Sequence, residues 1–185
     1  MIWNAYMRIR PYRGILPTLG ARAYIDESAR VIGDVVLGED VSVWPFTVIR
    51  GDVNFVRIGD RTNIQDGSVV HVSHDGPHAK LGGFATRIGS DVTIGHKAIV
   101  HACTIEDAVL VGMGAIVLDG AVVRKHAFIG AGALVAPGKI VGEGELWLGN
   151  PAKKARMLSD AEIDALYYSA KHYVRLKDEY LAAAL

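Results

Sequence analysis

Aliphatic residues recur at every sixth position through most of this 185-residue chain, and this period limits the available folds more than any other feature. One run consists of Ile25, Val31, Leu37, Val43 and Ile49. A period of six fits neither the 3.6-residue helix nor two-residue alternation, and a sandwich of ordinary strands has no such period. Hexapeptide repeats build parallel β-helices. We therefore predict an all-β solenoid in which three six-residue units form each coil and the aliphatic side chains fill its interior.

Departures from the period divide the chain into segments. The repeats pause at 53–57 and fail at 74–87, where we expect an excursion from the coil. They end at Asn150-Pro151, and Ser159 with Glu162 then resembles a capping box that opens a helix over about 160–182. The expected segments are a lead-in over 1–24, the β-helix over 25–152, and a linker with a C-terminal α-helix over 153–185.

The charge balance and composition argue against several classes of function. Lys plus Arg equals Asp plus Glu at 20 each, and only 8% of residues are aromatic. A neutral chain poor in aromatic residues lacks the usual surfaces for nucleic acid or an anionic membrane. The single cysteine, Cys103, excludes an intrachain disulfide, and no stretch resembles a signal peptide or a membrane span. We expect a cytoplasmic protein.

Three histidines fall at related phases of the repeat. His71 directly follows Val70 and His101 directly follows Val100. With the excursion removed, these two positions are one full coil apart, so the two imidazoles should stack as neighbours. His96 belongs to the preceding hexapeptide and therefore to a different face. Imidazole is the commonest metal ligand among side chains, and three histidines with one open position form a catalytic zinc site.

No single prism can easily bring His96 to the other two histidines, and this geometry predicts a homotrimer. In a closed ring of three chains, one face of each subunit abuts a different face of the next. His96 of one chain would then complete the site begun by His71 and His101 of its neighbour. By the same phase argument we expect Gln65 to stack beneath His96, and we expect Arg50 and Asp66 to meet across the interface.

The chain resembles the gamma-class carbonic anhydrases over nearly its whole length. The resemblance rests on Arg50-Gly51-Asp52, on the run from Asn63 to Gly67, and on His71, Gly95-His96 and His101. It implies a left-handed parallel β-helix, a homotrimer, and a metal held by two histidines of one subunit and one of the next. It further implies that Gln65 contacts the metal-bound solvent, with Asn63 nearby, while Arg50, Asp52 and Asp66 hold the interface and the site. Tyr168 best matches a tyrosine that reaches the pocket from the C-terminal helix in some relatives.

Two acidic positions of the active family members are replaced here, by Val53 and His74. In those members both are glutamates that serve proton transfer, so His74 and His78 become the candidates for a proton shuttle. We expect reversible hydration of carbon dioxide to bicarbonate, with Zn²⁺ as the metal and Fe²⁺ or Co²⁺ as alternatives. Three other functions stay open: an acyl-CoA thioesterase that uses the same metal, an acyltransferase, and a non-catalytic metal-bearing assembly protein.

Overall fold

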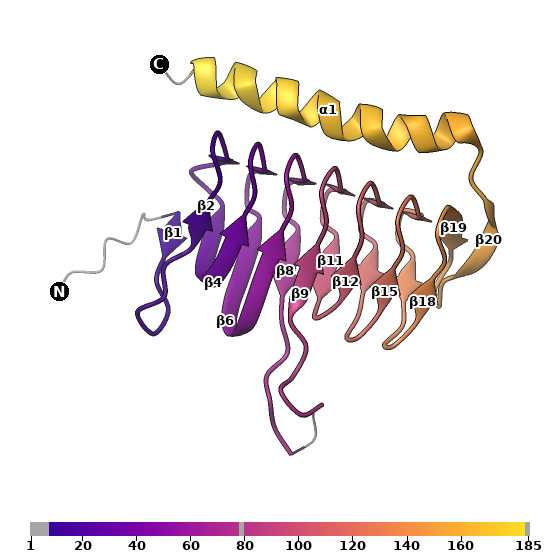
Figure 1. Cartoon of the computed structure of the whole chain (residues 1–185), viewed down its shortest axis with the longest axis horizontal. Coiled ribbons are helices and arrows are strands. Elements are labelled where there is room, and N and C mark those ends of the chain that lie inside the picture. Colours follow the sequence, from indigo (N-terminus) through magenta and orange to yellow (C-terminus); the bar gives the residue numbers. More distant parts are fainter. Residues whose placement is uncertain (1–7, 78–79, 184–185) are drawn as a thin grey trace.

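A computed structural model describes residues 8–77 and 80–183, and it shows a parallel β-solenoid with one long helix. The strands form one twelve-stranded and one eight-stranded sheet. The helix, α1 (Asp160–Ala183), runs along one side of the coils, and the loop between β8 and β9 projects from the opposite side (Figure 1). The parallel solenoid of hexapeptide repeats and its C-terminal helix are thus confirmed.

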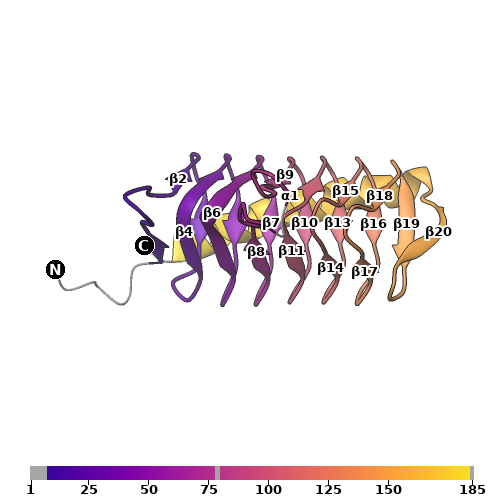
Figure 2. The ribbon, with the colours of Figure 1, turned by 90° about the horizontal axis from the view of Figure 1, so that it is seen from below.

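The strands line up on three faces of the solenoid. The eight-stranded sheet makes the face beneath the helix, here called the helix face: β3 (Tyr24–Ile25), β5 (Ser42–Val43), β7 (Asn63–Ile64), β10 (Thr93–Ile94), β13 (Leu110–Val111), β16 (Phe128–Ile129), β19 (Glu145–Leu148) and β20 (Lys153–Met157). The second face, here called the histidine face, contains β8 (Val69–His71), β11 (Ile99–His101), β14 (Ile116–Val117) and β17 (Leu134–Val135). The third face contains β9 (Thr86–Ile88), β12 (Thr104–Ile105), β15 (Val122–Val123) and β18 (Ile140–Val141). Figure 2 shows the strands of successive coils lying side by side along the molecule.

Two long strands turn the corner between the histidine face and the third face. These are β4 (Arg30–Leu37) and β6 (Val48–Ile58). The first part of β6 pairs with β8, and its last part pairs with β9. Its register against β4 shifts between Gly33 and Val35, and Ile49 still lies opposite Val70. The pause at 53–57 is therefore a bulge at a corner, which leaves the stacking on both sides intact.

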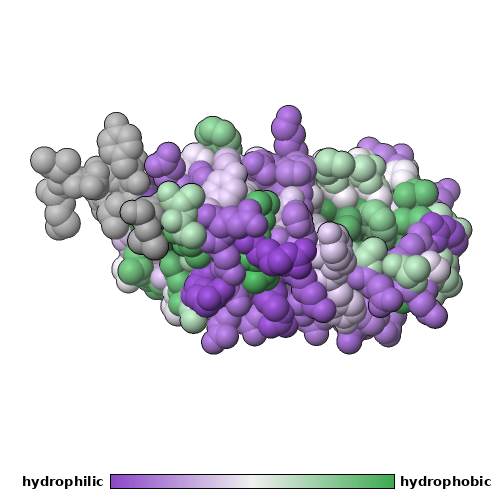
Figure 3. Space-filling view, turned by 90° about the horizontal axis from the view of Figure 1, so that it is seen from above, coloured by the Kyte–Doolittle hydropathy of each residue, from purple (hydrophilic) through white to green (hydrophobic). Residues whose placement is uncertain are grey.

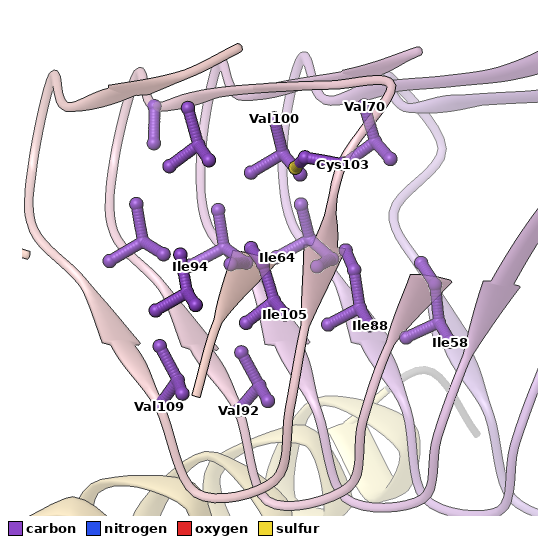
Figure 4. Packing of buried hydrophobic residues seen from close by; sticks show 14 of the residues in the cluster. Ile58, Ile64, Val70, Ile88, Val92, Ile94, Val100, Cys103, Ile105 and Val109 are labelled. Carbon is purple, nitrogen blue, oxygen red and sulfur yellow. The ribbon is translucent and has the colours of Figure 1, made fainter. Parts of the chain in front are cut away.

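The aliphatic residues of the six-residue period form columns in the interior. On the helix face Ile64 lies beside Ile94, and on the histidine face Val70 lies beside Val100. Figure 4 shows these side chains pointing into the coil in successive layers. The columns belong to one continuous buried cluster, so neighbouring coils share a single core. Each fully buried side chain of this kind contributes roughly 1.5–3 kcal/mol, which offsets the ordering of many short strands.

The helix lies on the coils through aromatic contacts and one charged group. The Trp44 ring packs edge-on against those of Tyr173 and Tyr180. Lys177 is fully buried, and its Nζ lies 2.8 Å from Asp40 Oδ1 in an early coil. These contacts fix the helix along the solenoid. Seen from the helix side, the surface is mostly hydrophilic with apolar patches between (Figure 3).

Short strands close the two ends of the solenoid. In the lead-in, β1 (Ile9–Arg10) and β2 (Thr18–Leu19) pair with β4, while residues 1–7 lie outside the described part. At the other end β20 pairs antiparallel with β19, within the segment expected to be a linker. None of the helices in the described residues is long and apolar enough to cross a membrane.

Candidate metal site

His71 and His101 lie side by side on adjacent strands. They are direct partners in the register of β8 and β11, as the phase of the repeat predicts. His71 Nδ1 lies 3.2 Å from His101 Nε2, and the ring centroids are 5.2 Å apart. Two nitrogens bound to one tetrahedral zinc ion at about 2.0–2.1 Å would be separated by about 3.4 Å. The pair therefore fits the bite of a single metal ion.

Each of the three candidate histidines contacts one carboxylate. His71 Nε2 lies 3.0 Å from Asp52 Oδ1, and His96 Nδ1 lies 2.8 Å from Asp66 Oδ2. His101 Nδ1 lies 2.6 Å from Asp119 Oδ1. In His71 and His101 the nitrogen that faces the other histidine is the one without a carboxylate. Metal-binding histidines typically hold their second nitrogen in this way, which fixes the ring.

Burial and hydrogen bonding shift the pKa values of the His71–Asp52 pair. Burial lowers the pKa of His71 and outweighs the opposing effect of its hydrogen bond to Asp52. Burial alone would raise the pKa of Asp52, but its hydrogen bonds with His71 and Arg50 outweigh that effect and lower it. The imidazole is thus held neutral beside an ionised carboxylate. A neutral imidazole is the form that binds a metal.

The structure corrects the expected stacking beneath His96. Ile64 pairs with Ile94, so Gln65 lies level with Gly95, and Asp66 is the residue that lies beneath His96. Gln65 is the first residue after its strand and His96 is the second after its own, so the two side chains do not stack. Arg50 pairs with Asp52 within the chain, so the structure does not bring Arg50 and Asp66 together in one subunit.

His96 is separated from the other two histidines by the width of the histidine face. It lies at the corner that precedes β11, whereas His101 ends β11. Within residues 8–77 and 80–183, three or more His, Cys, Asp or Glu side chains nowhere gather into a group that could hold a metal ion. In a single chain the candidate ligands therefore form a pair and a separate third residue.

One cavity lies beside the pair His71 and His101, and another lies beside His96. One, of ≈ 550 Å³, is lined by His71, His101, Val53, His74 and Asp119, among others. The other, of ≈ 390 Å³, lies between the helix face and α1, and its lining includes His96, Gln65, Met113, Phe128 and Tyr173. Asn63 is buried behind Gln65 and accepts a 3.0 Å hydrogen bond from Gln65 Nε2.

Tyr173, and not Tyr168, is the tyrosine of α1 that lines a cavity beside a candidate ligand. Tyr168 is 65% exposed, and its ring stacks on His172 at the surface of the helix. Tyr173 shares the apolar spacing of Leu166 and Ala170 along the helix, whereas Tyr168 does not, so this spacing favours Tyr173. The sequence analysis also missed Asp119, although it lies only 18 residues from His101, close to one coil.

The excursion between β8 and β9 is fixed at its base. Asn54, in the bulge of β6, donates hydrogen bonds to the carbonyl oxygens of Ser73 and Gly82. The Phe84 ring lies against Gly120, where an added Cβ would approach it to 3.0 Å. His74 is thereby held in the cavity of His71 and His101. His78, the other candidate shuttle, lies outside the described residues.

Comparison with known proteins identifies the family. The chain is 55% identical to Protein YrdA of Escherichia coli over 94% of each chain. It is 45% identical to a carbonic anhydrase of Geobacillus kaustophilus over 95% of this chain and 91% of the relative. It is 47% identical to the mitochondrial gamma carbonic anhydrase 2 of Arabidopsis thaliana over 86% of this chain and 57% of the relative. The chain belongs to the gamma carbonic anhydrase family.

A solved structure agrees with the hexapeptide-repeat solenoid. A hexapeptide transferase family protein from Anaplasma phagocytophilum superposes with a TM-score of 0.86 at 45% identity, over 94% of this chain and 99% of that one. No model of a known protein family matches the chain.

Proposed function

We propose that this chain catalyses the zinc-dependent reversible hydration of carbon dioxide at sites shared between three copies of itself. The observation that carries the proposal is the separation of 3.2 Å between His71 Nδ1 and His101 Nε2, with a carboxylate on the other nitrogen of each ring. This arrangement is a prepared two-point metal site. Relatives named as carbonic anhydrases, at 45% and 47% identity, support the reaction.

His96 supplies the third ligand from a neighbouring chain. His96 and His101 belong to the same coil, one at each edge of the histidine face. Rotation about an axis parallel to the solenoid keeps every coil at its own level, so His96 of one copy meets His101 of the next. Asp66 and His71 share the neighbouring coil, and Arg50 lies beside His71 one coil earlier, so the long Arg50 side chain would come within reach of Asp66 of the next subunit.

The histidine face itself is suited to cover by another copy. One outward column of this face is aliphatic over five coils, and the column beside it contains His71 and His101; the aliphatic residues are Val48, Val69, Ile99, Ile116 and Leu134. Val69 and Ile99 are each 37% exposed in the single chain. A continuous apolar surface between two polar edges is typical of a protein interface. Three such faces turned toward one axis would bury these side chains.

The residues around the site have separate tasks in this reaction. When bound, zinc supplies a Lewis acid that lowers the pKa of a water molecule toward about 7. Asp52, Asp66 and Asp119 hold the three imidazoles in orientation. Apolar side chains such as Val53 and Met113 line the cavities that would receive carbon dioxide, a small apolar gas. His74, which lines the same cavity as His71 and His101, is our candidate for the group that passes a proton to solvent.

Stopped-flow hydration measurements test the function. Protein loaded with Zn²⁺, Co²⁺ or, without oxygen, Fe²⁺ is mixed with carbon dioxide at several pH values, and metal content is measured on the same samples. We expect hydration well above the buffer rate, and we expect His96→Ala to abolish both the rate and tight metal binding. A rate equal to that of buffer with every metal would overturn the proposal.

The cavity beside His96 favours one second candidate. At ≈ 390 Å³, with Leu110, Met113 and Phe128 in its wall, it is larger than carbon dioxide requires. An acyl chain of a thioester would fit such an apolar space. Thioester hydrolysis by the same site is therefore the alternative, and a screen with acyl-CoA substrates of increasing chain length separates the two reactions.

A further inference from the structure

A chain of side-chain hydrogen bonds joins Gln65 to the C-terminal helix. Gln65 Nε2 donates to Asn63 Oδ1 at 3.0 Å, and Asn63 Nδ2 donates to Thr93 Oγ1 at 3.0 Å. Thr93 Oγ1 in turn lies 3.0 Å from Ser169 Oγ of α1. Gln65, Asn63 and Thr93 are all buried. This series of hydrogen bonds thus leads from the cavity of His96, through the helix face, to the Ser169 hydroxyl on α1.

The chemistry of the donor and acceptor groups gives this series of hydrogen bonds a direction. A carboxamide nitrogen only donates hydrogen bonds and its oxygen only accepts them. Asn63 Nδ2 is directed to Thr93 and to the backbone oxygen of Val92, so Asn63 Oδ1 is left for Gln65. Gln65 therefore turns its nitrogen toward Asn63 and its oxygen toward the cavity. Thr93 Oγ1 accepts from Asn63 and makes a further hydrogen bond with Ser169 Oγ, in which either hydroxyl can be the donor.

We propose that Ser169 is a positioning residue that helps to hold the orientation of the Gln65 carboxamide. Ser169 holds the Thr93 hydroxyl from the helix and, together with the Val92 oxygen, keeps Asn63 Nδ2 directed toward β10. The cavity beside His96 is then given an oxygen acceptor and not an N–H donor. The orientation stands on the hydrogen bonds alone, whereas its importance for catalysis rests on the proposed hydration of carbon dioxide.

Loss of the Ser169 hydroxyl would loosen this series of hydrogen bonds. The Thr93 hydroxyl would then have no partner on the helix and could rotate, so it would hold Asn63 Nδ2 less firmly. Asn63 would keep its 3.4 Å bond to the Val92 oxygen, which prevents a flip but fixes the side chain less well. The Gln65 carboxamide, which donates to Asn63 Oδ1, would become more mobile as a result.

Nuclear magnetic resonance of metal-free protein tests the orientation directly. The side-chain amide signals of Gln65 are assigned by their disappearance in Gln65→Ala. We expect Ser169→Ala to shift these signals and speed their hydrogen exchange, while Ser169→Thr, which keeps the hydroxyl, restores them. Lys171→Ala, an exposed neighbour on the same helix, is the matched control and should change nothing. Unchanged Gln65 signals in Ser169→Ala would overturn the proposal.

Kinetics of metal-loaded protein test the consequence. We expect Ser169→Ala to lower kcat/KM roughly five- to tenfold at unchanged metal content, as for the loss of one hydrogen bond. In the Gln65→Ala background the same substitution should have no further effect. An equal loss in both backgrounds would show that Ser169 acts elsewhere. If the wild type hydrates no carbon dioxide, the proposed function fails, but the amide signals still decide the role of Ser169.

Discussion

His71 Nδ1 and His101 Nε2 lie 3.2 Å apart although 30 residues separate them in the chain. The stacking of coils alone produces this proximity, because the two residues occupy the same position in successive turns of the solenoid. The third candidate ligand cannot join them within the chain. The proposed site therefore depends on two repeats: the stacking of coils along the solenoid, and the three-fold arrangement of copies in the proposed trimer.

Mixed trimers would reveal a site divided between chains. His96→Ala and His101→Ala each remove one ligand, and neither should bind zinc tightly alone. When the two variants are unfolded together and refolded, about one site in four should regain all three histidines, because each lesion lies on a different side of the interface. Zinc content measured by mass spectrometry should rise accordingly.

The matched control combines His71→Ala with His101→Ala. These lesions lie on the same side of the interface, so mixing them should restore no complete site. Recovery of zinc binding in this control, or its absence in the first mixture, would contradict the division of ligands proposed here.

Asp119→Asn should weaken metal binding without unfolding the chain. The carboxylate lies 2.6 Å from His101 Nδ1 and fixes that ring. Loss of such a partner typically lowers metal affinity by about 10–100-fold. Competition with a chelator would measure the change, and Asp164→Asn on the exposed face of α1 serves as the control. Equal affinity in both variants would mean that Asp119 does not position the ligand.

Val53→Glu should speed hydration in weakly buffered solution. Val53 is 45% exposed and lines the cavity of His71 and His101, at the position where active members of the family carry a glutamate. A carboxylate there would carry protons to solvent, and such groups contribute about 10²–10⁴-fold in favourable cases. We expect kcat to rise several-fold at low buffer concentration and little at high concentration. Val53→Gln, which has nearly the same shape but cannot titrate, should give no rise.

Ile99→Glu should prevent assembly. Ile99 lies in the aliphatic surface of the histidine face and is 37% exposed. Three buried carboxylates at one axis would repel one another and lose their hydration. Light scattering should then show monomers, and mass spectrometry should find little bound zinc. Ile140→Glu makes the same change on the third face, where the isoleucine is 61% exposed, and should remain trimeric.

Asp40→Asn should destabilise the helix contact in a pH-dependent way. Burial raises the pKa of Asp40, but hydrogen bonds from Lys177 and Arg22 outweigh it and hold the pKa below its ordinary 3.8. A lowered pKa in the folded state contributes stability above about pH 3.8 that disappears as pH falls through the folded value. Urea unfolding at pH 7, 5, 4 and 3 should show a difference between variant and wild type that shrinks only in the most acidic samples. A constant difference would exclude this origin.

The sequence predicted the fold well because one short pattern governs most of the chain. A six-residue period fixes which residues point inward, and three periods per coil then fix which residues stack. The pairs Val70–Val100 and His71–His101 follow from this rule alone. The bulge of β6 could be absorbed because it lies at a corner, where extra residues do not alter the pairing on either face.

The site was harder to predict where residues lie beyond the strands. Gln65 and His96 follow their strands by one and two residues, and only the register shows that Asp66 is the partner of His96. Tyr168 is the match that the family resemblance implies, whereas the apolar spacing of α1 favours Tyr173, which packs against Trp44. Asp119 carries no motif, and its role follows only from its distance to His101.

The bulge of β6 and the excursion after β8 have a common consequence for how such a molecule could diversify. Both insertions leave the solenoid at a corner, and both are joined by Asn54, which holds Ser73 and Gly82. New segments of different length or chemistry could therefore be grafted at this point while the ladder beneath stays unaltered. The paired strands that hold the core are thus physically separate from the corner segments, whose length does not alter the strand pairing.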